Sequence, residues 1–457
     1  MGNLVNIANL KKTWYYFRRN GIRAAVHAAG ERLFQKYEKE YVYSVPEERE
    51  LEAQRAACGE AGIRFSILVP AYETKEAHLR QMVDSVLAQT YPHWELLIAD
   101  GGKSSHVEEV AGSYTDSRIR YFRLPENAGI SRNTNAALKR ASGDYVGLLD
   151  HDDFLTPEAL FQVVQCLEQG RRQGREYLLI YSDEDKCDET GKQFYEPHRK
   201  TEFNLDLFLT NNYICHFLVM RRELMDGLQF RSTYDGAQDY DICLRAVGEC
   251  MDRGEQPEER IAHIPRVLYH WRCHRGSTAA NPRSKAYAYE AGRKALEEFL
   301  KQRGWQGSVS HTAHVGFYHI DYENGIFAQR KDIAAVGGKA VDRKGRILPC
   351  IYDEEGYPLY AGLPASYAGY LNRAVLAQNA AALSMEYWEV NPGLQSEISA
   401  FLKEIETLRK ADTSESEKDF EDRKEMSRKL CRRLREEGYR LYWDPGRVIY
   451  CRGEEGK

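Results

Sequence analysis

The sequence predicts an α/β protein built on a doubly wound sheet of parallel strands. From Phe65 onward, short apolar runs alternate with segments whose apolar residues recur at helical spacing, as in repeated strand and helix units. The 457 residues, 42% of them hydrophobic and 29% charged, suffice for two or three domains with apolar cores. Acidic residues follow two of the apolar runs, and ligands of such sheets bind outside the carboxyl ends of the strands. We therefore expect a ligand site at this edge.

Strands and helices are expected to alternate between residues 65 and 170. The expected strands are apolar runs bounded by polar or turn residues: 65–69, 94–100, 119–124 and 144–149. The expected helices are segments with apolar residues at intervals of three and four: 78–90, 104–114, 130–143 and 157–170. This order brings the acidic residues at the ends of the second and fourth strands, Asp100 and Asp150 to Asp153, to the same edge of the sheet.

The stretch GLLDHDDF at residues 147–154 places three carboxylates and an imidazole directly after an apolar run. Like charges this close repel one another and raise one another's pKa unless a cation compensates them. Asp150 and Asp152 are spaced to share a hard divalent ion, whose open positions would suit diphosphate oxygens. Alternatively, Asp153 and Thr156 cap a helix that begins at Pro157, and the spacing alone favours neither interpretation.

Composition and motif content argue against several function classes. A formal net charge of −5 and a pI near 6.3 are unusual for a general nucleic-acid-binding protein, so no nucleic-acid partner is expected. The chain has no G-x-x-x-x-G-K-[ST] loop and no G-x-G-x-x-G after the first expected strand, which disfavours P-loop and dinucleotide-binding proteins. Its ten cysteines form no C-x-x-C pair, and no signal peptide or membrane span is recognisable. We therefore expect a cytoplasmic protein with reduced thiols.

Residues 1–63 are expected to form a helical N-terminal extension. Between residues 10 and 36, basic side chains are interleaved with aromatic ones, as in Lys12, Trp14 and Arg18. Such a mixture is typical of a helix on an anionic membrane surface, and equally of a helix that packs its aromatic side chains on a neighbouring domain. Peripheral contact with the inner face of the plasma membrane through residues 10–36 is therefore one of two expectations for this segment.

Several separated motifs resemble those of the inverting glycosyltransferases of family 2. They stand in the family's order between Phe65 and about Ala280 and begin with FSILVPAYE, WELLIADGG and GDYVGLLDHDDF. The later motifs YSDEDK, NNYICH, GAQDYDICLR and PRVLYHWRCHRGSTA resemble the branch found in bacterial surface-polysaccharide synthesis, which includes rhamnosyltransferases. The resemblance implies the GT-A fold, with a mixed sheet flanked by helices, a nucleotide-sugar donor, and Mg²⁺ or Mn²⁺ as cofactor.

The resemblance assigns donor binding to six residues: Pro70, Tyr72, Asp100, Arg132, Asp150 and Asp152. It implies that Tyr72 stacks on the nucleotide base. It also implies that Arg132 binds the donor diphosphate, where a guanidinium makes paired charge-assisted bonds. The family usually has a second aspartate after the position of Asp100, but this chain has Gly101, so the identity of the base is left open.

The resemblance also implies a metal site and a general base. Asp152 matches the main metal ligand, Asp150 matches the first position of the D-x-D motif, and His274 matches a histidine that reaches the metal or the diphosphate. In a single displacement the acceptor hydroxyl must lose a proton. Asp239 matches the family's general base, although Gln238 replaces the glutamate that usually precedes it.

Four residues are placed on the acceptor or sugar side: Asp183, Asp185, Gln238 and His270. Asp183 and Asp185 lie in the motif SDEDK, which we expect to end another strand at the same edge. The alternative for these two acids is a turn held by an ion pair with Lys186. His270 is the competitor of His274 for the metal, and a single histidine is more often structural.

The C-terminal third resembles the middle of a second family 2 module. We divide the chain into the extension 1–63, a GT-A domain 64–305 and a smaller α/β region 306–457. No apolar strand followed by a D-x-D motif occurs between Ala280 and Ala335, so the last region is expected to be a degenerate, catalytically inactive module. Basic and hydroxyl side chains, Ser427, Arg428 and Lys429, stand where its acidic pair would be. The polar run 410–425 is expected to be a mobile insertion.

Together, the motifs predict a metal-dependent inverting glycosyltransferase of bacterial cell-surface polysaccharide synthesis. Its partners would be a nucleotide-sugar donor and a lipid-linked or polymeric glycan acceptor. Because Gly101 and Gln238 depart from the family pattern, a noncatalytic nucleotide-sugar-binding or scaffold subunit of a polysaccharide assembly complex is the alternative. A nucleotidyltransferase with a similar sheet is a third interpretation.

Overall fold

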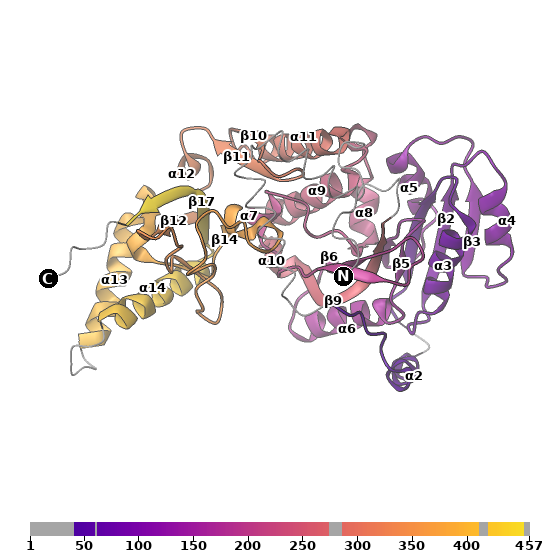
Figure 1. Ribbon diagram of the computed structural model, residues 1–457, viewed down its shortest axis with the longest axis horizontal. Helices are drawn as coiled ribbons and strands as arrows, with labels where there is room; N and C mark the ends of the chain where they lie inside the picture. The colour runs from indigo at the N-terminus through magenta and orange to yellow at the C-terminus, as the bar shows by residue number, and fades with distance from the viewer. Residues whose placement is uncertain (1–40, 60–61, 274–285, 411–418, 452–457) are drawn as a thin grey trace, which may run out of the picture. The chain divides into compact units, whose positions relative to one another are not determined.

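The computed structural model describes residues 41–59, 62–273, 286–410 and 419–451, which form two units (Figure 1). Described residues up to 203 and from 212 to 302 belong to the first unit, and described residues from 204 to 211 and from 303 onward belong to the second. Residues 204–211 were expected in the first domain, but they cluster with the second unit. The predicted membrane-contact segment 10–36 lies outside the described residues. No helix of the described ranges is long and apolar enough to cross a bilayer.

The first unit contains nine strands and most of the helices. Its strands are β1 (Phe65–Ala71), β2 (Trp94–Asp100), β3 (Ile119–Arg123), β4 (Tyr145–Leu148), β5 (Phe154–Leu155), β6 (Leu179–Cys187), β7 (Phe194–His198), β8 (Leu218–Arg221) and β9 (Ile261–Arg272). Its helices are α2 (Glu48–Ala57), α3 (Glu76–Leu87), α4 (His106–Gly112), α5 (Ile130–Leu138), α6 (Ala159–Arg172), α8 (Arg222–Leu228), α9 (Gln238–Asp252), α10 (Pro257–Arg260) and α11 (Ala286–Gln302).

These nine strands form one mixed sheet in the order β3-β2-β1-β4-β8-β6-β9-β5, with β7 paired to β6. Strands β1 to β4 run parallel to their neighbours within this set, and β6 runs parallel to β9. Strand β8 enters between β4 and β6 and runs antiparallel to both. The all-parallel sheet expected from strand and helix alternation is therefore wrong, because the apolar run of β8 carries no signal of direction. The mixed, helix-flanked GT-A sheet implied by the resemblance is confirmed.

One apolar core fixes the carboxyl ends of the first strands. Helix α3 has apolar residues at intervals of three and four, and they pack on alternate residues of the neighbouring strands. The buried cluster includes Ile67, Val69, Leu79, Met82, Val86, Leu96, Ile98, Leu160, Val163 and Leu167. The ends of β1, β2 and β4 are thereby held along a single edge, and the predicted donor-site residues follow these ends.

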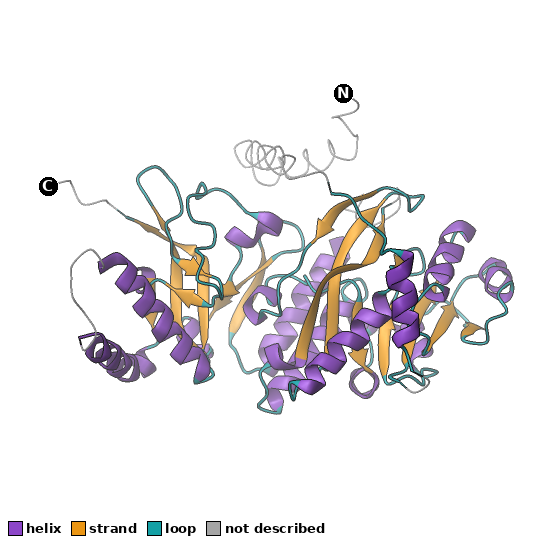
Figure 2. Cartoon of the chain, turned by 90° about the horizontal axis from the view of Figure 1, so that it is seen from below, coloured by secondary structure: helices purple, strands orange, loops and turns teal. Residues whose placement is uncertain are grey.

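The second unit is a smaller α/β structure. Its elements are α7 (Leu205–Phe208), β10 (Gly307–His311), β11 (Tyr318–Tyr322), α12 (Ile326–Gln329), β12 (Ile333–Val341), β13 (Ile351–Tyr352), β14 (Gln378–Asn379), β15 (Ala382–Leu383), β16 (Trp388–Val390), α13 (Gln395–Lys410), α14 (Asp419–Glu436) and β17 (Arg440–Tyr450). The main sheet has the order β14-β17-β12-β16, and β12 runs parallel to β17. Helices α13 and α14 lie side by side next to this sheet (Figure 2).

Two details of the second unit correct the sequence-based expectations. Of the polar run 410–425, residue 410 ends α13 and residues 419–425 begin α14, so these parts are helical rather than inserted loop. Residues 204–211 are tied into the second unit by the fully buried Arg330. Its guanidinium donates to Asp206 at 2.6 Å and to Asp332 at 2.7 Å. A buried charge is costly unless it is paired, and these two carboxylates pair it.

Candidate functional site

Three neighbouring parallel strands deliver predicted donor-site residues to one edge of the sheet. In the register of the sheet, Ala71 at the end of β1 lies beside Asp100 at the end of β2. Leu68 of β1 lies beside Leu148, which ends β4 two residues before Asp150. Pro70 lies within β1, and the ring of Tyr72 directly after this strand is 45% exposed. The exposed tyrosine and the acidic turn therefore share the carboxyl edge, where ligands of such sheets bind.

Asp100 holds the loop after β2 in place. The residue is fully buried, and its Oδ1 accepts a hydrogen bond from the amide of Gly102 at 2.7 Å. Its Oδ2 accepts one from the hydroxyl of Tyr121 at 2.9 Å. A Cβ atom added at Gly101 would lie 2.9 Å from the Nδ2 atom of Asn133, so the second aspartate of the family has no room here. Both carboxylate oxygens of Asp100 are thus engaged in shaping the loop.

Glu73 is a residue of this edge that the sequence analysis missed. Its Oε1 accepts a hydrogen bond from the amide of Lys103 at 2.6 Å, and its Oε2 accepts one from the hydroxyl of Ser104 at 2.8 Å. These hydrogen bonds, that of Ser104 first, lower the pKa of Glu73. Glu73 therefore fixes the β2 loop next to Tyr72. The signal was an acid two residues after the first strand.

Asp153 does not cap a helix. Its Oδ2 accepts a hydrogen bond from the hydroxyl of Tyr269 at 2.6 Å, and its Oδ1 accepts one from the amide of Arg272 at 2.7 Å. Helix α6 begins only at Ala159. Burial, and then the charges of Asp152 and Asp150, raise the pKa of Asp153 well above its usual value. The helix-capping alternative for Asp153 is therefore wrong, and this carboxyl group joins the acidic turn to strand β9.

The charges of several other residues act on the carboxyl group of Asp150. Burial raises the pKa of its carboxyl group, and the charges of Asp152 and Asp239 act in the same direction. The imidazoles of His216 and His151 oppose this rise. Asp239 begins helix α9, about ninety residues further along the chain, and nevertheless acts on Asp150. The structure thus brings the two halves of the predicted site together.

Asp239 lies in the first turn of α9. Its Oδ2 accepts a hydrogen bond from the thiol of Cys215 at 2.9 Å and one from the side-chain amide of Asn212 at 3.3 Å. Gln238 uses its Oε1 to accept a hydrogen bond from the amide of Gly236 at 2.8 Å, which closes the loop before the helix. The carboxylate of Asp239 is thereby oriented by side chains of the NNYICH motif.

A second missed residue, His216, supplies positive charge to the acidic turn. Its Nδ1 lies 2.8 Å from the Oε2 atom of Glu184, and its ring stacks on that of Tyr269 with centroids 4.9 Å apart. Burial alone would lower the pKa of His216, but the charge and the hydrogen bond of Glu184 outweigh burial and raise it to about 9. At neutral pH His216 is therefore an imidazolium. The signal was the final histidine of NNYICH.

Glu184 is itself held in the charged form by cations. Burial would raise its pKa, but Lys200 and His216 lower it well below the usual value. The ammonium of Lys200 lies 3.7 Å from the Oε2 atom of Glu184 and also donates to the carbonyl oxygen of His216. The group of Glu184, Lys200 and His216 is named the cationic cluster below, because it carries one carboxylate and two basic side chains.

The structure contradicts the expected position of Asp183 and Asp185. Strand β6 continues to Cys187, so both acids lie inside the strand rather than at its end. Asp183 accepts hydrogen bonds from the amide of Lys200 and from the ring of His263, each at 2.8 Å. No turn at Lys186 forms there, so the ion-pair alternative is wrong as well.

His270 is the partner of Asp185 and is fully enclosed. Its Nδ1 lies 2.6 Å from the Oδ1 atom of Asp185, and the hydroxyl of Tyr41 donates to the other carboxylate oxygen at 2.7 Å. Aromatic rings of Tyr43, Phe154 and Phe194 surround the imidazole. Asp185 and His270 thus form a buried hydrogen-bonded pair, and their assignment to the acceptor side stays a prediction.

Of the predicted ligands Arg132 and His274, the structure describes only the first. Arg132 lies on α5, and within the described ranges its exposed guanidinium has no hydrogen bond or ion pair. The helix begins beside Asp235, whose Oδ1 accepts a hydrogen bond from the amide of Ser131 at 3.3 Å. Asp235 lies four residues before Asp239. The hydrogen bond from Ser131 therefore joins the segment of Arg132, the predicted diphosphate ligand, to the segment of Asp239, the predicted general base. His274 lies outside the described residues.

The donor set for a metal is restricted to few side chains. Among the residues that the structure describes, no group of three or more histidines, cysteines or acids is arranged to hold a metal ion. Asp150 and Asp152 together offer carboxylate oxygens only, which suits Mg²⁺ or Mn²⁺ rather than a softer metal. Burial and then the charges of Asp152 and Asp239 raise the pKa of Asp150, and a cation at this turn would offset both causes. Most of its coordination positions would belong to ligand oxygens.

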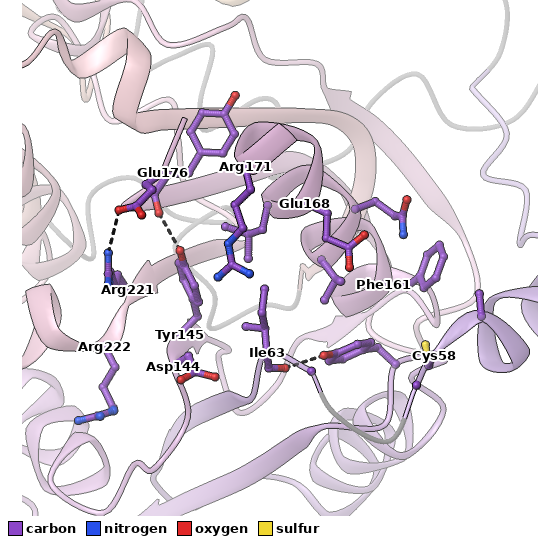
Figure 3. Close-up of a pocket in the computed structure, with 18 of the residues that line it drawn as sticks. Cys58, Ile63, Asp144, Tyr145, Phe161, Glu168, Arg171, Glu176, Arg221 and Arg222 are labelled. Carbon is purple, nitrogen blue, oxygen red and sulfur yellow. Dashed lines mark hydrogen bonds and ion pairs between the residues drawn. The ribbon is translucent and has the colours of Figure 1, made fainter. Parts of the chain in front are cut away.

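A cavity of about 640 Å³ lies at the opposite edge of the same sheet. Figure 3 shows residues that line it. Ile63 and Asp144, which precede β1 and β4, belong to its wall, together with Glu168 and Arg171 of α6. None of the predicted site residues lines this cavity. It is therefore separate from the carboxyl edge at which the donor site is predicted.

Comparisons with known proteins give the family that the first unit resembles. The model of the family described as "Glycosyl transferase family 2" matches residues 66–228. An uncharacterized protein y4gI of Sinorhizobium fredii is 41% identical over 52% of this chain and 26% of its own length. The O-antigen biosynthesis protein RfbC of Myxococcus xanthus is 32% identical over 56% of this chain and 20% of its own length. The putative colanic acid biosynthesis glycosyl transferase WcaA of Escherichia coli is 27% identical over 44% of this chain and 72% of its own length.

The solved structures to which the chain is similar include TarS and a mannosyltransferase. TarS of S. aureus in complex with UDP-GlcNAc is 17% identical, with a TM-score of 0.40 over 53% of this chain and 66% of that chain. The mannosyltransferase PcManGT of Pyrobaculum calidifontis in complex with GDP-Man and Mn²⁺ is 16% identical, with a TM-score of 0.37 over 65% of this chain and 82% of that chain. The first unit of the chain carries a glycosyl transferase family 2 domain, matched over residues 66–228.

Proposed function

We propose that the first unit is a metal-dependent inverting glycosyltransferase. It transfers a sugar from a nucleoside diphosphate donor to a glycan or lipid-linked glycan acceptor in the synthesis of a bacterial surface polysaccharide. The observation that supports this most is the half-buried Asp150, whose pKa is raised by burial and by Asp152 and Asp239 at the carboxyl edge of parallel strands. The names of two relatives, an O-antigen biosynthesis protein and a colanic acid biosynthesis transferase, support the polysaccharide assignment.

The donor site follows from the placement of the residues. Asp150 and Asp152 would hold Mg²⁺ or Mn²⁺, which when bound supplies positive charge against the leaving diphosphate. The exposed ring of Tyr72 offers a face for the nucleotide base. The guanidinium of Arg132 offers paired hydrogen bonds to phosphate oxygens.

The acceptor side is served by Asp239 and the cationic cluster. Asp239 takes the proton of the acceptor hydroxyl as that oxygen attacks the anomeric carbon. The hydrogen bonds from Cys215 and Asn212 orient its carboxylate for this task. The imidazolium of His216 opposes the rise in the pKa of Asp150 that burial and the neighbouring acids cause.

A donor panel tests this function. The full chain is incubated with UDP-glucose, UDP-GlcNAc, GDP-mannose and dTDP-rhamnose in the presence of Mn²⁺, and release of the nucleoside diphosphate is measured. We expect slow release from at least one donor, its loss in Asp152→Asn and on addition of EDTA, and its retention in Asp84→Asn on the surface of α3. The anomeric configuration of the product, read by NMR, should be inverted.

Two results would contradict the proposal. Binding of a donor without release from any of them would favour the noncatalytic nucleotide-sugar-binding subunit. Release that persists in Asp152→Asn or in EDTA would remove the metal and the acidic turn from the reaction.

A further inference from the structure

The second unit contains a cleft of about 810 Å³ that the proposed reaction does not use. It opens on the face of β12 and β17, at Val336, Tyr442 and Asp444, and is walled by β11, α12 and the short helical turn Pro392–Leu394. Its volume lies in the range of ligand-binding pockets, about 300–1,000 Å³. The opposite face of the same strands carries Trp443 and packs on α14. The cleft is therefore a property of one defined sheet face, and it is called the second-unit cleft below.

The lining of the second-unit cleft mixes ring faces with polar side chains. Phe327, Tyr439 and Tyr442 contribute aromatic surface, and Asn324, Glu389 and Asp444 contribute hydrogen-bonding groups. Aromatic rings bind apolar C–H surface, while amide and carboxylate groups bind hydroxyls. A sugar ring presents both kinds of surface at once.

The charges of the cleft argue against an anionic ligand. Its acids are Asp321, Glu389 and Asp444, and its cations are Lys331 and Arg447, so it has no positive excess. Arg447 is already paired with Glu389 at 2.5 Å, and the ammonium of Lys331 donates to the carbonyl oxygen of Phe327 at 2.9 Å. Phosphate groups bind where arginines, helix N-termini or metal ions are available to them. An uncharged ligand fits this cleft better than a nucleotide or a polyanion.

The position of the cleft also argues against an added peptide strand. Peptides commonly extend a sheet at an open edge. In the order β14-β17-β12-β16, the strands beneath the cleft are the two inner ones. The ligand would therefore lie across the face of the sheet, held by side chains rather than by the ladder of the backbone.

We propose that the second-unit cleft binds an uncharged oligosaccharide stretch of the glycan that the first unit extends. This inference rests on the proposed function for the choice of the glycan, but the cleft and its lining are independent of the acidic turn. The second unit would act as a binding module that retains the growing chain.

Titration of the full chain with neutral hexasaccharides tests this inference. The probes are maltohexaose, cellohexaose, chitohexaose and mannohexaose, with a heparin hexasaccharide and UDP as charged comparators, and heat is measured by calorimetry. Gly393→Trp fills the cleft, since a Cβ atom there meets only the Oδ1 atom of Asn391, at 3.4 Å. Ala328→Trp fills it from α12, so the test does not depend on the folding of one variant. Gly393→Ala and Gly112→Trp on α4 are the matched controls.

We expect at least one neutral hexasaccharide to bind, with affinity lowered at least about tenfold by either cleft-filling tryptophan and unchanged in both controls. Three results would overturn the inference. None of the four neutral probes binds, or the tryptophan variants bind them as tightly as the wild type does. In the third, the heparin hexasaccharide binds more tightly than the neutral probes and the tryptophan variants abolish that binding. A dimer seen by light scattering that Gly393→Trp dissolves would also overturn it, since the occupant would then be a second copy.

Release of nucleoside diphosphate, measured on the same samples, separates this inference from the proposed function. Absence of saccharide binding by the wild type, with intact donor cleavage, counts against the cleft alone. Saccharide binding without any donor cleavage counts against the proposed function alone.

Discussion

The two units each contain a parallel strand pair built on the same plan, β6 with β9 and β12 with β17. In each pair a long helix, α9 or α14, precedes the second strand, and the register slips partway along the pair. Each first strand ends in an Asp-x-x-Gly turn, Asp188 to Gly191 and Asp342 to Gly345. The aspartate amides donate across these turns at 3.0 and 2.9 Å, and the glycines have φ of +70° and +73°. The backbone frame is therefore shared.

The side chains of the two frames differ. Aligned on the two turns, Asp183, Glu184 and Asp185 of β6 correspond to two glycines and Lys339 of β12. All four side chains are buried. The three acids each accept hydrogen bonds, whereas Lys339 donates one long hydrogen bond of 3.5 Å. The frame thus forms without the polar network. We propose that the second unit is a degenerate repeat of the acceptor half of the first, and that the network serves the chemistry of the first unit.

Of the substitutions that test this comparison, Asp239→Asn should have the largest effect, which is on the rate of sugar transfer. Loss of a positioned general base lowers rates by about 10² to 10⁴-fold, so transfer to an acceptor should fall by this factor while UDP or GDP still stabilises the protein in a thermal shift. Lys429→Gln, on the exposed surface of the corresponding helix α14, should leave the rate unchanged. Equal losses in both variants would show that both units take part in catalysis.

Asp185→Asn should destabilise the first unit. The carboxylate accepts from Tyr41 and pairs with His270 in a buried setting, and loss of a charged hydrogen-bond partner costs about 2 kcal/mol. Urea unfolding followed by tryptophan fluorescence measures the change in the free energy of unfolding. An unchanged midpoint would mean that the buried network of β6 contributes no more to stability than its counterpart in β12.

Lys339→Met, at the matching position of the second unit, should leave the free energy of unfolding unchanged or raise it. Burial lowers the pKa of Lys339, and a buried cation with one long hydrogen bond is commonly replaced by an apolar residue at no cost or with a gain of up to about 1 kcal/mol. The same unfolding assay applies. Destabilisation by more than about 1 kcal/mol would reveal a role for this ammonium that its contacts do not suggest.

The pH dependence of stability should differ between the units by a smaller amount. The pKa of His216 is raised from 6.5 to about 9 in the folded chain, because Glu184 outweighs burial. Its contribution is therefore complete below pH 6.5 and is lost as the pH rises through about 9. The free energy of unfolding should fall over this window in the wild type and fall less in His216→Asn. Identical slopes would contradict the imidazolium assignment.

The sequence predicted the carboxyl edge of the sheet better than the buried hydrogen bonds of Asp183, Glu184 and Asp185 in β6. Strand β2 was expected at residues 94–100 and is found there, because a continuous apolar run bounded by polar residues has few alternatives. The convergence of Asp150 and Asp239 followed from motifs matched to a family. The structure brings both into one electrostatic environment, although their catalytic roles stay predictions.

The missed features depend on contacts between distant segments. His216 lies just before β8, an inner strand that runs antiparallel to its neighbours, and its partner Glu184 lies inside β6, so no local spacing joins them. The extension of β6 through its acids was not predicted, since charged residues are rare in buried strands unless they are paired. The membership of residues 204–211 in the second unit depends on Arg330, which lies more than a hundred residues away.

Manganese binding tests the central claim most directly, namely that the acidic turn after β4 holds a cation together with a donor diphosphate. Free Mn²⁺ is followed by electron paramagnetic resonance during titration of the full chain in the presence of UDP or GDP. The account predicts one bound ion per chain, with affinity at least about tenfold lower in Asp150→Asn and Asp152→Asn and unchanged in Asp84→Asn. Binding of equal strength in the wild type and in a variant that carries both substitutions would contradict it.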